Sequence, residues 1–441
     1  MSGVWEQTLR LLSLSDANVR YVLAGMMLLG LAGGVLGSFT LLRKRALIGD
    51  ALAHAALPGI GIAFIVTGTK TIGVLLAGAY AAGVLGVLSL MAIRRYSRVK
   101  EDSALAIVLT VFFGVGIVIL TYIQKTGKAS QSGLDKFLFG QSASLIGGEV
   151  LLISAAAVIL VTASILLYKE FKLLCFDPGY SSAIGFSAAW LDIILMALAV
   201  GAVVIGLQAV GVVLMAALLI IPPVTARLWT NRFGVMIVTA GALGAISGAL
   251  GSYLSFLAPK MPSGPLTVLA ATTLFTVSLF IAPERGLISR MLQHRSNRRR
   301  TELENSLRAA AEWLEINHRS LDTAFSPAEL ATIRKWSAVE VGNRLRQLSR
   351  KGFIKRNADR SYSLTNEGTR SARGILQRHR LWETYLMHQA EIAVDHVHRD
   401  ADEMEHFLTP EMEQKLAGLL DKAPEELSSP HPLEHLEADN V

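Results

Sequence analysis

Residues 103–123 read SALAIVLTVFFGVGIVILTYI, an apolar run without a charged side chain. A run of this length can cross the hydrocarbon core of a bilayer as a helix. The whole chain has 441 residues, of which 52% are hydrophobic, and a mean hydropathy of +0.44. These values are too apolar for one soluble domain. We therefore predict a polytopic helical membrane protein.

Similar runs recur as far as Pro283, after which the chain becomes charged and amphipathic. They predict an all-α bundle of about eight or nine transmembrane helices. The predicted spans are 19–41, 47–67, 72–93, 103–123, 146–168, 188–206, 208–226, 233–257 and 264–283. Almost no room for a turn separates the pair 188–206 and 208–226, so one long broken segment is the alternative.

Basic side chains gather in the segments between these runs, as in Arg43-Lys44-Arg45 and in Arg295 to Arg300. If the basic loops are cytoplasmic, nine spans place the N-terminus outside the cell and the C-terminal part in the cytoplasm. Residues 1–18 lack the pattern of a signal peptide. The single Cys175 excludes an internal disulfide framework and a cysteine-based zinc site. We expect a multi-pass protein of the cell (inner or cytoplasmic) membrane.

Small residues recur at helical spacing in several spans. Gly30, Gly34 and Gly37 form one such face, Gly73 with Ala77 a second, and Gly241, Ala245 and Gly248 a third. Small side chains let two helix backbones approach closely, so these faces predict packing contacts rather than a pore.

Asp50 and His54 stand out because ionisable groups are costly inside an apolar segment. His54 is the only histidine between residues 20 and 284. The two residues are four apart, so a carboxylate oxygen and an imidazole nitrogen can converge on one cation. Mixed oxygen and nitrogen ligands suit manganese, iron(II) or zinc. The alternative is a helix-capping Asp50 beside a solvated His54, but the helix-breaking Pro58 and Gly59 favour a site.

The run Gly49-Asp50-Ala-Leu-Ala-His54-Ala-Ala-Leu-Pro58-Gly59 resembles the signature of the permease subunits of manganese/zinc/iron ABC importers. Further segments agree, namely Phe137-Leu-Phe-Gly140, the loop at 170–187 and Gly211 to Arg227. The resemblance covers residues 19–285 and implies that Asp50 and His54 line the metal path. It also implies that the loop at 170–187 couples to a separate ATPase through Phe176, Asp177, Pro178, Ala183 and Gly185.

The same resemblance implies a permease dimer and an extracytoplasmic metal-binding protein. No Gly-x-x-x-x-Gly-Lys-Ser/Thr loop occurs in the sequence, so we expect a transport subunit that is not itself an enzyme. Manganese is the favoured ion, and zinc or iron(II) are alternatives.

Beyond residue 302 the sequence predicts a winged helix-turn-helix. Ser326-Pro-Ala-Glu329 and Ser337-Ala-Val-Glu340 are two capping boxes that open successive short helices. Residues 353–356 and 361–364 then flank a plausible hairpin turn. Basic residues on the second helix and the hairpin suit phosphate contact, although a solvent-facing or membrane-facing basic surface is the alternative. The candidate DNA-binding residues are Arg344, Arg346, Arg350, Lys351, Lys355 and Arg356.

Two His/carboxylate stripes follow. One carries His379 and Glu383 at i and i+4, and the next carries His398, Asp402, Glu405 and His406. Such stripes are often solvated helix faces, but two on neighbouring helices favour a divalent metal.

Residues 302–432 resemble the iron- and manganese-dependent repressor family. By that resemblance His379, Glu383 and His398 form one metal site, and Asp402, Glu405 and His406 the other. Asn305 and Arg308 stand where the first helix should supply further ligands, which makes the second site incomplete or weak.

We therefore predict a divalent-metal ABC permease fused to a repressor-like cytosolic metal-sensing domain, whose candidate roles are gating of transport and DNA binding. A membrane-tethered metal-responsive transcription regulator and a metal-chelate (siderophore- or corrinoid-type) permease are the alternatives. The predicted domains are an N-terminal segment (1–18), a transmembrane domain (19–285), a basic linker (286–301), a winged helix-turn-helix (302–365), a helical metal-binding and dimerisation domain (366–432) and a tail (433–441).

Overall fold

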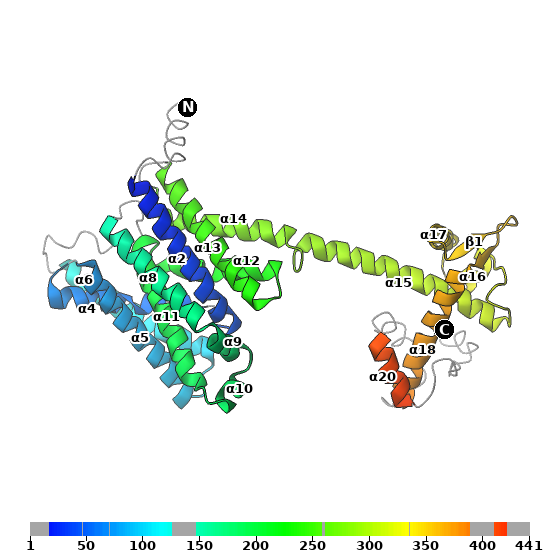
Figure 1. Ribbon diagram of the computed structural model, residues 1–441, viewed down its shortest axis with the longest axis horizontal. Coiled ribbons are helices and arrows are strands. Elements are labelled where there is room, and N and C mark those ends of the chain that lie inside the picture. The colour runs from blue at the N-terminus through cyan, green and yellow to red at the C-terminus, as the bar shows by residue number, and fades with distance from the viewer. Residues whose placement is uncertain are drawn as a thin grey trace, which may run out of the picture. The chain divides into compact units, whose positions relative to one another are not determined.

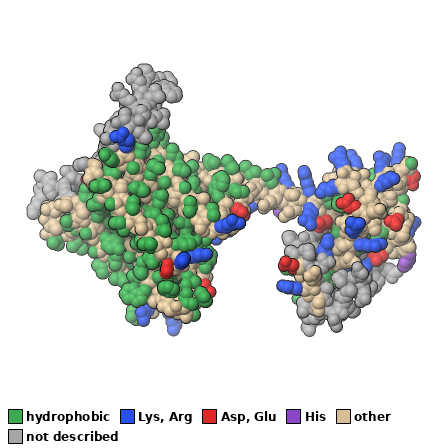
Figure 2. Space-filling view, viewed as in Figure 1, with side chains coloured by type: hydrophobic (Ala, Val, Ile, Leu, Met, Phe, Trp, Pro, Cys, Tyr) green, Lys and Arg blue, Asp and Glu red, His purple; other side chains and the backbone are tan. Residues whose placement is uncertain are grey.

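The computed structural model describes residues 17–45, 47–69, 71–125, 147–257, 261–334, 336–388 and 410–420. The chain divides into two compact units (Figure 1), which we call the membrane unit (residues 1–290) and the C-terminal unit (residues 291–441). Hydrophobic side chains cover most of the visible face of the membrane unit, whereas Lys and Arg stud the C-terminal unit (Figure 2). This contrast agrees with a lipid-facing part and a water-facing part.

Long helices build the membrane unit. Within the described residues, eight helical segments are long and apolar enough to cross a membrane, and the predicted all-α bundle is confirmed. The helices are α2 (Ala17–Leu42), α3 (Ile48–Ala55), α4 (Leu57–Thr67), α5 (Ile72–Tyr96), α6 (Glu101–Lys125), α8 (Gly147–Leu166), α9 (Tyr168–Phe176), α10 (Pro178–Ala183), α11 (Ala188–Ala209), α12 (Val212–Trp229), α13 (Phe233–Phe256) and α14 (Ser263–Ile281). Helices α3 and α4 together make one candidate span. In α12 the apolar stretch Met215–Trp229 is shorter than these spans.

Helices α2 and α13 pack along each other through the predicted small residues. A Cβ atom added at Gly30 would collide with the carbonyl of Gly244, and one added at Gly248 would collide with the carbonyl of Met26. Glycine is therefore required for this backbone approach. Gly73 was expected on a similar face, but among the described residues of this chain nothing lies within 4 Å of the Cβ it could carry. Within the described part of the chain α5 meets α4 where Gly78 faces Gly59.

The pair of spans at 188–206 and 208–226 is resolved as two helices. The first continues to Ala209, and the second begins at Val212, so the turn lies at Val210 and Gly211 rather than at residue 207. Gly211 has a φ of 95°, a conformation that side-chain-bearing residues rarely adopt. One glycine thus allows the short connection that the hydropathy pattern alone left in doubt.

The C-terminal unit confirms the predicted winged helix-turn-helix. Its elements are α15 (Leu287–Ile316), which begins in the membrane unit, α16 (Pro327–Arg334), α17 (Ala338–Arg350), β1 (Ile354–Arg356), β2 (Tyr362–Leu364), α18 (Asn366–His388) and α20 (Pro410–Leu420). The strands are antiparallel, with Ile354 opposite Leu364. Both capping boxes form, because Ser337 and Glu340 exchange side-chain to backbone hydrogen bonds and Ser326 does the same with Glu329.

One apolar core joins these elements except α20, whose Leu416 packs with Leu381 of α18 in a separate cluster. Leu307 of α15, Phe325 before α16, Leu345 of α17 and Ile354 of β1 are all buried in it. One face of α15 and one face of α17 point toward this core. The polar side chains of both helices therefore lie either on the surface or at the edge of the core. Helices α15 and α18 thereby bring Arg308 and His379 together, as described below.

Candidate functional sites

Asp50 and His54 lie on α3 and face each other, as their spacing predicts. His54 Nε2 is 3.5 Å from Asp50 Oδ1. The Asp50 side chain is 41% exposed and that of His54 is 16% exposed. The edge of the Phe113 ring of α6 packs on the imidazole, with ring centroids 4.8 Å apart. His54 Nδ1 is buried and has no hydrogen-bond partner among the described residues. The pair is thus open to solvent on the carboxylate side, and within the described part of the chain Asp50 is the one group opposite an imidazole nitrogen of His54.

The helix carrying this pair ends because of the residues that follow it. Helix α3 stops at Ala55, and α4 begins at Leu57 with Pro58 in its first turn. Proline has no N–H, so Pro58 cannot donate to the carbonyl of His54, which lies four residues earlier. The alternative role of Asp50 as a helix cap is wrong, because the N-cap position is Leu47 and no side chain caps α3. Asp50 lies in the first turn, where its charge still complements the helix dipole.

A buried ion-pair cluster precedes this helix and was not predicted. Arg45, with a side chain 4% exposed, holds both carboxylate oxygens of Asp192 at 2.7 Å through Nη1. Its Nε donates to Glu101 at 2.5 Å. Arg43 Nη2 lies 3.4 Å from Asp192 Oδ1, and its Nη1 donates to the carbonyl of Leu174 at 3.1 Å. Asp192 could have been suspected from sequence as the lone charge within the run 188–209.

The predicted coupling loop forms two short helices. Asp177 caps α10 by accepting from the backbone N–H of Tyr180 at 2.8 Å, and Pro178 occupies the first turn. Gly185, with a φ of 95°, ends the segment before α11. Ala183 is exposed at the end of α10. Four large apolar side chains on this loop are also exposed: Phe176 61%, Tyr180 57%, Ile184 48% and Phe186 43%. An apolar surface of this kind is typical of a protein contact.

Cys175, on α9 within this loop, is a partly buried free thiol. Its Sγ lies 3.7 Å from the carbonyl oxygen of Phe39. Burial, assisted by Asp192 and opposed by Arg43, raises the pKa of the thiol to about 12. The side chain therefore remains protonated near neutral pH, and a soft sulfur ligand is not supplied here.

Most of the candidate DNA-binding side chains lie on the surface. Arg346, Arg350, Lys351, Lys355 and Arg356 are exposed. Arg344 is half-buried, and its guanidinium stacks 4.1 Å from the centroid of the Trp336 ring. Hydrogen bonds from Ser337 lower the pKa of Glu340, so the cap of α17 carries a negative charge near neutral pH. The exposed set forms a basic surface on α17 and the hairpin.

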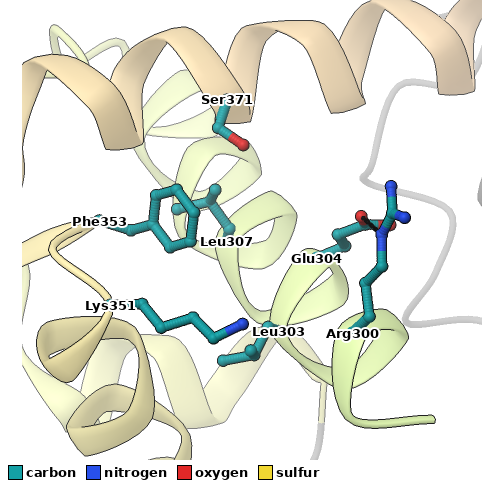
Figure 3. Close-up of a pocket in the computed structure, with 7 residues that line it drawn as sticks. All are labelled: Arg300, Leu303, Glu304, Leu307, Lys351, Phe353 and Ser371. Carbon is teal, nitrogen blue, oxygen red and sulfur yellow. Dashed lines mark hydrogen bonds and ion pairs between the residues drawn. The ribbon is translucent and has the colours of Figure 1, made fainter. Parts of the chain in front are cut away.

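A pocket of about 200 Å³ opens beside that surface in the C-terminal unit. Figure 3 shows Lys351 and Phe353 on one side of it and Arg300 with Glu304 on the other. Arg300 Nε donates to Glu304 at 2.8 Å, so this arginine is already paired. Of the predicted metal-binding residues that the structure describes, none lines the pocket.

His379 and Glu383 come together on α18, but they are sealed. His379 Nε2 lies 2.9 Å from Glu383 Oε1, and its Nδ1 lies 2.9 Å from Arg308 Nη1 on α15. Arg308 Nε lies 3.1 Å from Glu312 Oε1. All four residues are buried, and Arg308 and Glu383 have 0% exposure. We call these four side chains the Arg308 cluster.

The family resemblance implies a metal ion at His379 and Glu383, and the observed contacts do not fit one. A metal ligated by an imidazole lies about 2.0–2.1 Å from the nitrogen. The Arg308 guanidinium stands in front of one ring nitrogen and the Glu383 carboxylate in front of the other. No group of three or more metal-ligating side chains occurs in the described part of the chain. His398, Asp402, Glu405 and His406 lie outside the described residues, as does the segment 137–140.

Comparison with known proteins agrees with these two parts. Residues 15–282 match the model of the ABC 3 transport family, and residues 365–432 match the iron dependent repressor, metal binding and dimerisation domain. The manganese transport system membrane protein MntC of Bacillus subtilis is 43% identical over 410 residues, which is 93% of either chain. The zinc transport system membrane protein TroC of Treponema pallidum is 43% identical over 64% of this chain and 94% of its own.

A solved structure supports the membrane fold. The structure of PsaBC from Streptococcus pneumoniae in complex with Fab matches with a TM-score of 0.57 and 27% identity, over 66% of this chain and 99% of that one. The family match covers more than half of the chain, and the Bacillus relative covers nearly all of it. The chain is a multi-pass membrane permease that belongs to the ABC 3 transport family.

Proposed function

We propose that this permease imports a divalent transition metal, with manganese the favoured ion, and that Asp50 and His54 contact the ion in transit. The proposal rests on the His54–Asp50 pair, in which the carboxylate is partly exposed and no described residue contacts His54 Nδ1 by a hydrogen bond. A separation of 3.5 Å between His54 Nε2 and Asp50 Oδ1 suits two ligands that each lie about 2.1 Å from one ion. The names of the manganese and zinc relatives support the same class of cargo.

The arrangement has a simple chemical reading. The exposed Asp50 carboxylate supplies charge and an oxygen ligand to an arriving cation. No described residue donates to Nδ1, so an arriving cation can favour the tautomer with the proton there and take the Nε2 lone pair beside Asp50. A hard oxygen and a borderline nitrogen suit manganese, iron(II) and zinc better than a thiophilic ion. The metal of a bulky chelate is already ligated, so it would not coordinate to Asp50 and His54.

The chain needs partners for transport. The sequence lacks a nucleotide-binding loop, so ATP hydrolysis belongs to a separate ATPase that docks on the apolar surface at α9 and α10. Phe176, Asp177, Pro178, Ala183 and Gly185 shape this surface. A second permease copy and an extracytoplasmic metal-binding protein complete the importer, in keeping with the family.

Uptake of radiolabelled manganese tests the proposal. Membrane vesicles containing the full chain, its ATPase and its binding protein are compared with Asp50→Ala and His54→Ala vesicles. Asp102→Ala is the matched control, because Asp102 is also an exposed acid in the first turn of a helix. We expect both site variants to lose at least the roughly 10- to 100-fold that loss of a metal-supporting residue costs. Unchanged uptake in both variants would favour a chelate as the substrate.

A second candidate function concerns the C-terminal unit. We propose that its exposed basic surface contacts DNA phosphates, as the capped α17 and the hairpin suggest. The gene's own upstream DNA is incubated with the full chain in detergent, with and without manganese. Arg350→Ala and Lys355→Ala should weaken binding and reduce its salt dependence, whereas the exposed Arg373→Ala on α18 should not. Equal binding by all variants would leave gating of transport as the role of this unit.

A further inference from the structure

We infer that Arg308 is a built-in cation that takes the place of a metal ion in the cluster it forms with Glu312, His379 and Glu383. This part of the C-terminal unit is then held together without metal. The inference concerns residues that the transport proposal does not use, so it does not depend on that proposal. It also separates the resemblance to metal-dependent repressors from the chemistry that this chain carries.

The four side chains contact one another in a fixed order. Glu312 forms an ion pair with Arg308 on α15, Arg308 Nη1 meets His379 Nδ1, and His379 Nε2 meets Glu383 on α18. An alternation of acid, cation, imidazole and acid results. The guanidinium lies on the Nδ1 side of the His379 imidazole, between this ring and Glu312. Arg308 therefore supplies from within the chain a positive charge to the imidazole and to one carboxylate of the cluster.

The contacts of His379 determine which ring nitrogen carries the proton. A guanidinium carries only hydrogen-bond donors, so His379 Nδ1 must accept from Arg308. The ring proton then resides on Nε2 and is donated to the Glu383 carboxylate. Neither nitrogen offers a lone pair to a metal while these contacts hold. At His54, by contrast, no cation among the described residues meets Nδ1, and only Asp50 lies opposite Nε2.

The side chains of the Arg308 cluster are buried. Arg308 is the largest fully buried side chain in the part of the chain that the structure describes, and His379 is only 3% exposed. A buried guanidinium must keep its partners, since an unpaired charge in the interior is strongly disfavoured. A divalent ion at His379 would also lie within a few ångströms of this positive charge, where repulsion is poorly screened. Metal binding here requires that Arg308 leave the core.

The consequence concerns how the C-terminal unit could respond to metal. If the Arg308 cluster is closed to metal, any metal response of this unit must come from other residues, such as His398, Asp402, Glu405 and His406 outside the described part. The contact between α15 and α18 is then constant across metal concentrations. It acts as a structural link and not as a sensor.

Counting bound manganese tests the inference. The full chain in detergent carries Asp50→Ala and His54→Ala to remove the transport pair, and bound Mn²⁺ is measured by equilibrium dialysis. Adding His379→Gln should leave the number of bound ions unchanged and the Kd within about twofold. Loss of one equivalent, or a tenfold weaker Kd, overturns the inference. This arm needs no change at Arg308 and so does not depend on how that variant folds.

A second arm asks whether Arg308 is what excludes the metal. Arg308→Ala should gain one bound Mn²⁺, and the gain should disappear in the double variant with His379→Gln. Arg298→Ala is the matched control, since Arg298 makes an i,i+4 ion pair with Glu302 on the same helix but is exposed. It should gain nothing. A folded Arg308→Ala chain that gains no ion contradicts the assignment of Arg308 as the excluding cation.

Discussion

Two acid–histidine pairs with the same four-residue spacing lie in different surroundings. The pair Asp50 and His54 is partly open, and no cation among the described residues contacts its imidazole. The pair His379 and Glu383 is buried, and Arg308 contacts the imidazole from the other side. A buried arginine also stands near the first pair in the sequence, but Arg45 is held by Asp192 and Glu101. The comparison teaches that two pairs with the same spacing can differ in the placement of the neighbouring cation, and on our proposals this difference separates a metal path from a structural link.

The largest expected effect is the difference in stability between replacing the acid of the buried pair and replacing the acid of the open pair. Glu383→Ala removes the partner of a buried group and should destabilise the C-terminal unit by about 3–5 kcal/mol. Asp50→Ala, at a partly exposed position, should change stability by no more than about 0.5 kcal/mol. Urea titrations read by protease resistance measure both. Equal effects would mean that the two pairs are not different in kind.

The second prediction concerns the ion-pair cluster that occupies Arg45. Asp192→Asn keeps the size of the side chain but removes its charge, leaving Arg45 with Glu101 alone. We expect a loss of about 1.5–3 kcal/mol, the range for hydrogen bonds to charged groups. Thermal unfolding of the detergent-solubilised chain measures it, with Asp102→Asn as the exposed control. An unchanged midpoint would show that Arg43 and Arg45 need no acid on α11.

The third prediction sharpens the assignment of the open pair to metal. Asp50→Cys replaces a hard oxygen ligand by a thiolate and should shift uptake from manganese toward zinc. A tenfold change in the ratio of the two uptake rates, about 1.4 kcal/mol, is the expected size. Competition between the two ions in vesicles gives the ratio. The same exchange at Glu383 should leave the ratio unchanged, because that pair does not meet the cargo.

The smallest effect concerns the aromatic wall of the open pair. Phe113→Ala removes the ring that packs edge-on against His54 and should cost about 0.5–1.5 kcal/mol. Because the imidazole is then less well oriented, KM for manganese should rise while the maximal rate changes little. Phe112→Ala on the same helix is the control. A lower maximal rate with unchanged KM would place Phe113 in the transport step instead.

Much of the architecture follows from local patterns. Apolar runs long enough for a bilayer predicted the helices of the membrane unit, and the two capping boxes predicted where α16 and α17 begin. Both signals depend on neighbouring residues only. The turn between α11 and α12 was less certain, because hydropathy does not show that Gly211 takes up a positive φ. Gly73 is a related case, since a small residue permits a close contact but does not supply a partner.

The sequence by itself determined the class of the molecule, its two units, and the fact that Asp50 with His54 and His379 with Glu383 each share a helix face. Helical periodicity is enough for these conclusions. Tertiary structure alone decided what stands opposite each pair. Phe113 and Arg308 come from other helices, 59 positions from His54 and 71 positions from His379 respectively. Such contacts depend on packing between distant segments, and they determine whether an imidazole is left for a metal ion or already engaged by an arginine.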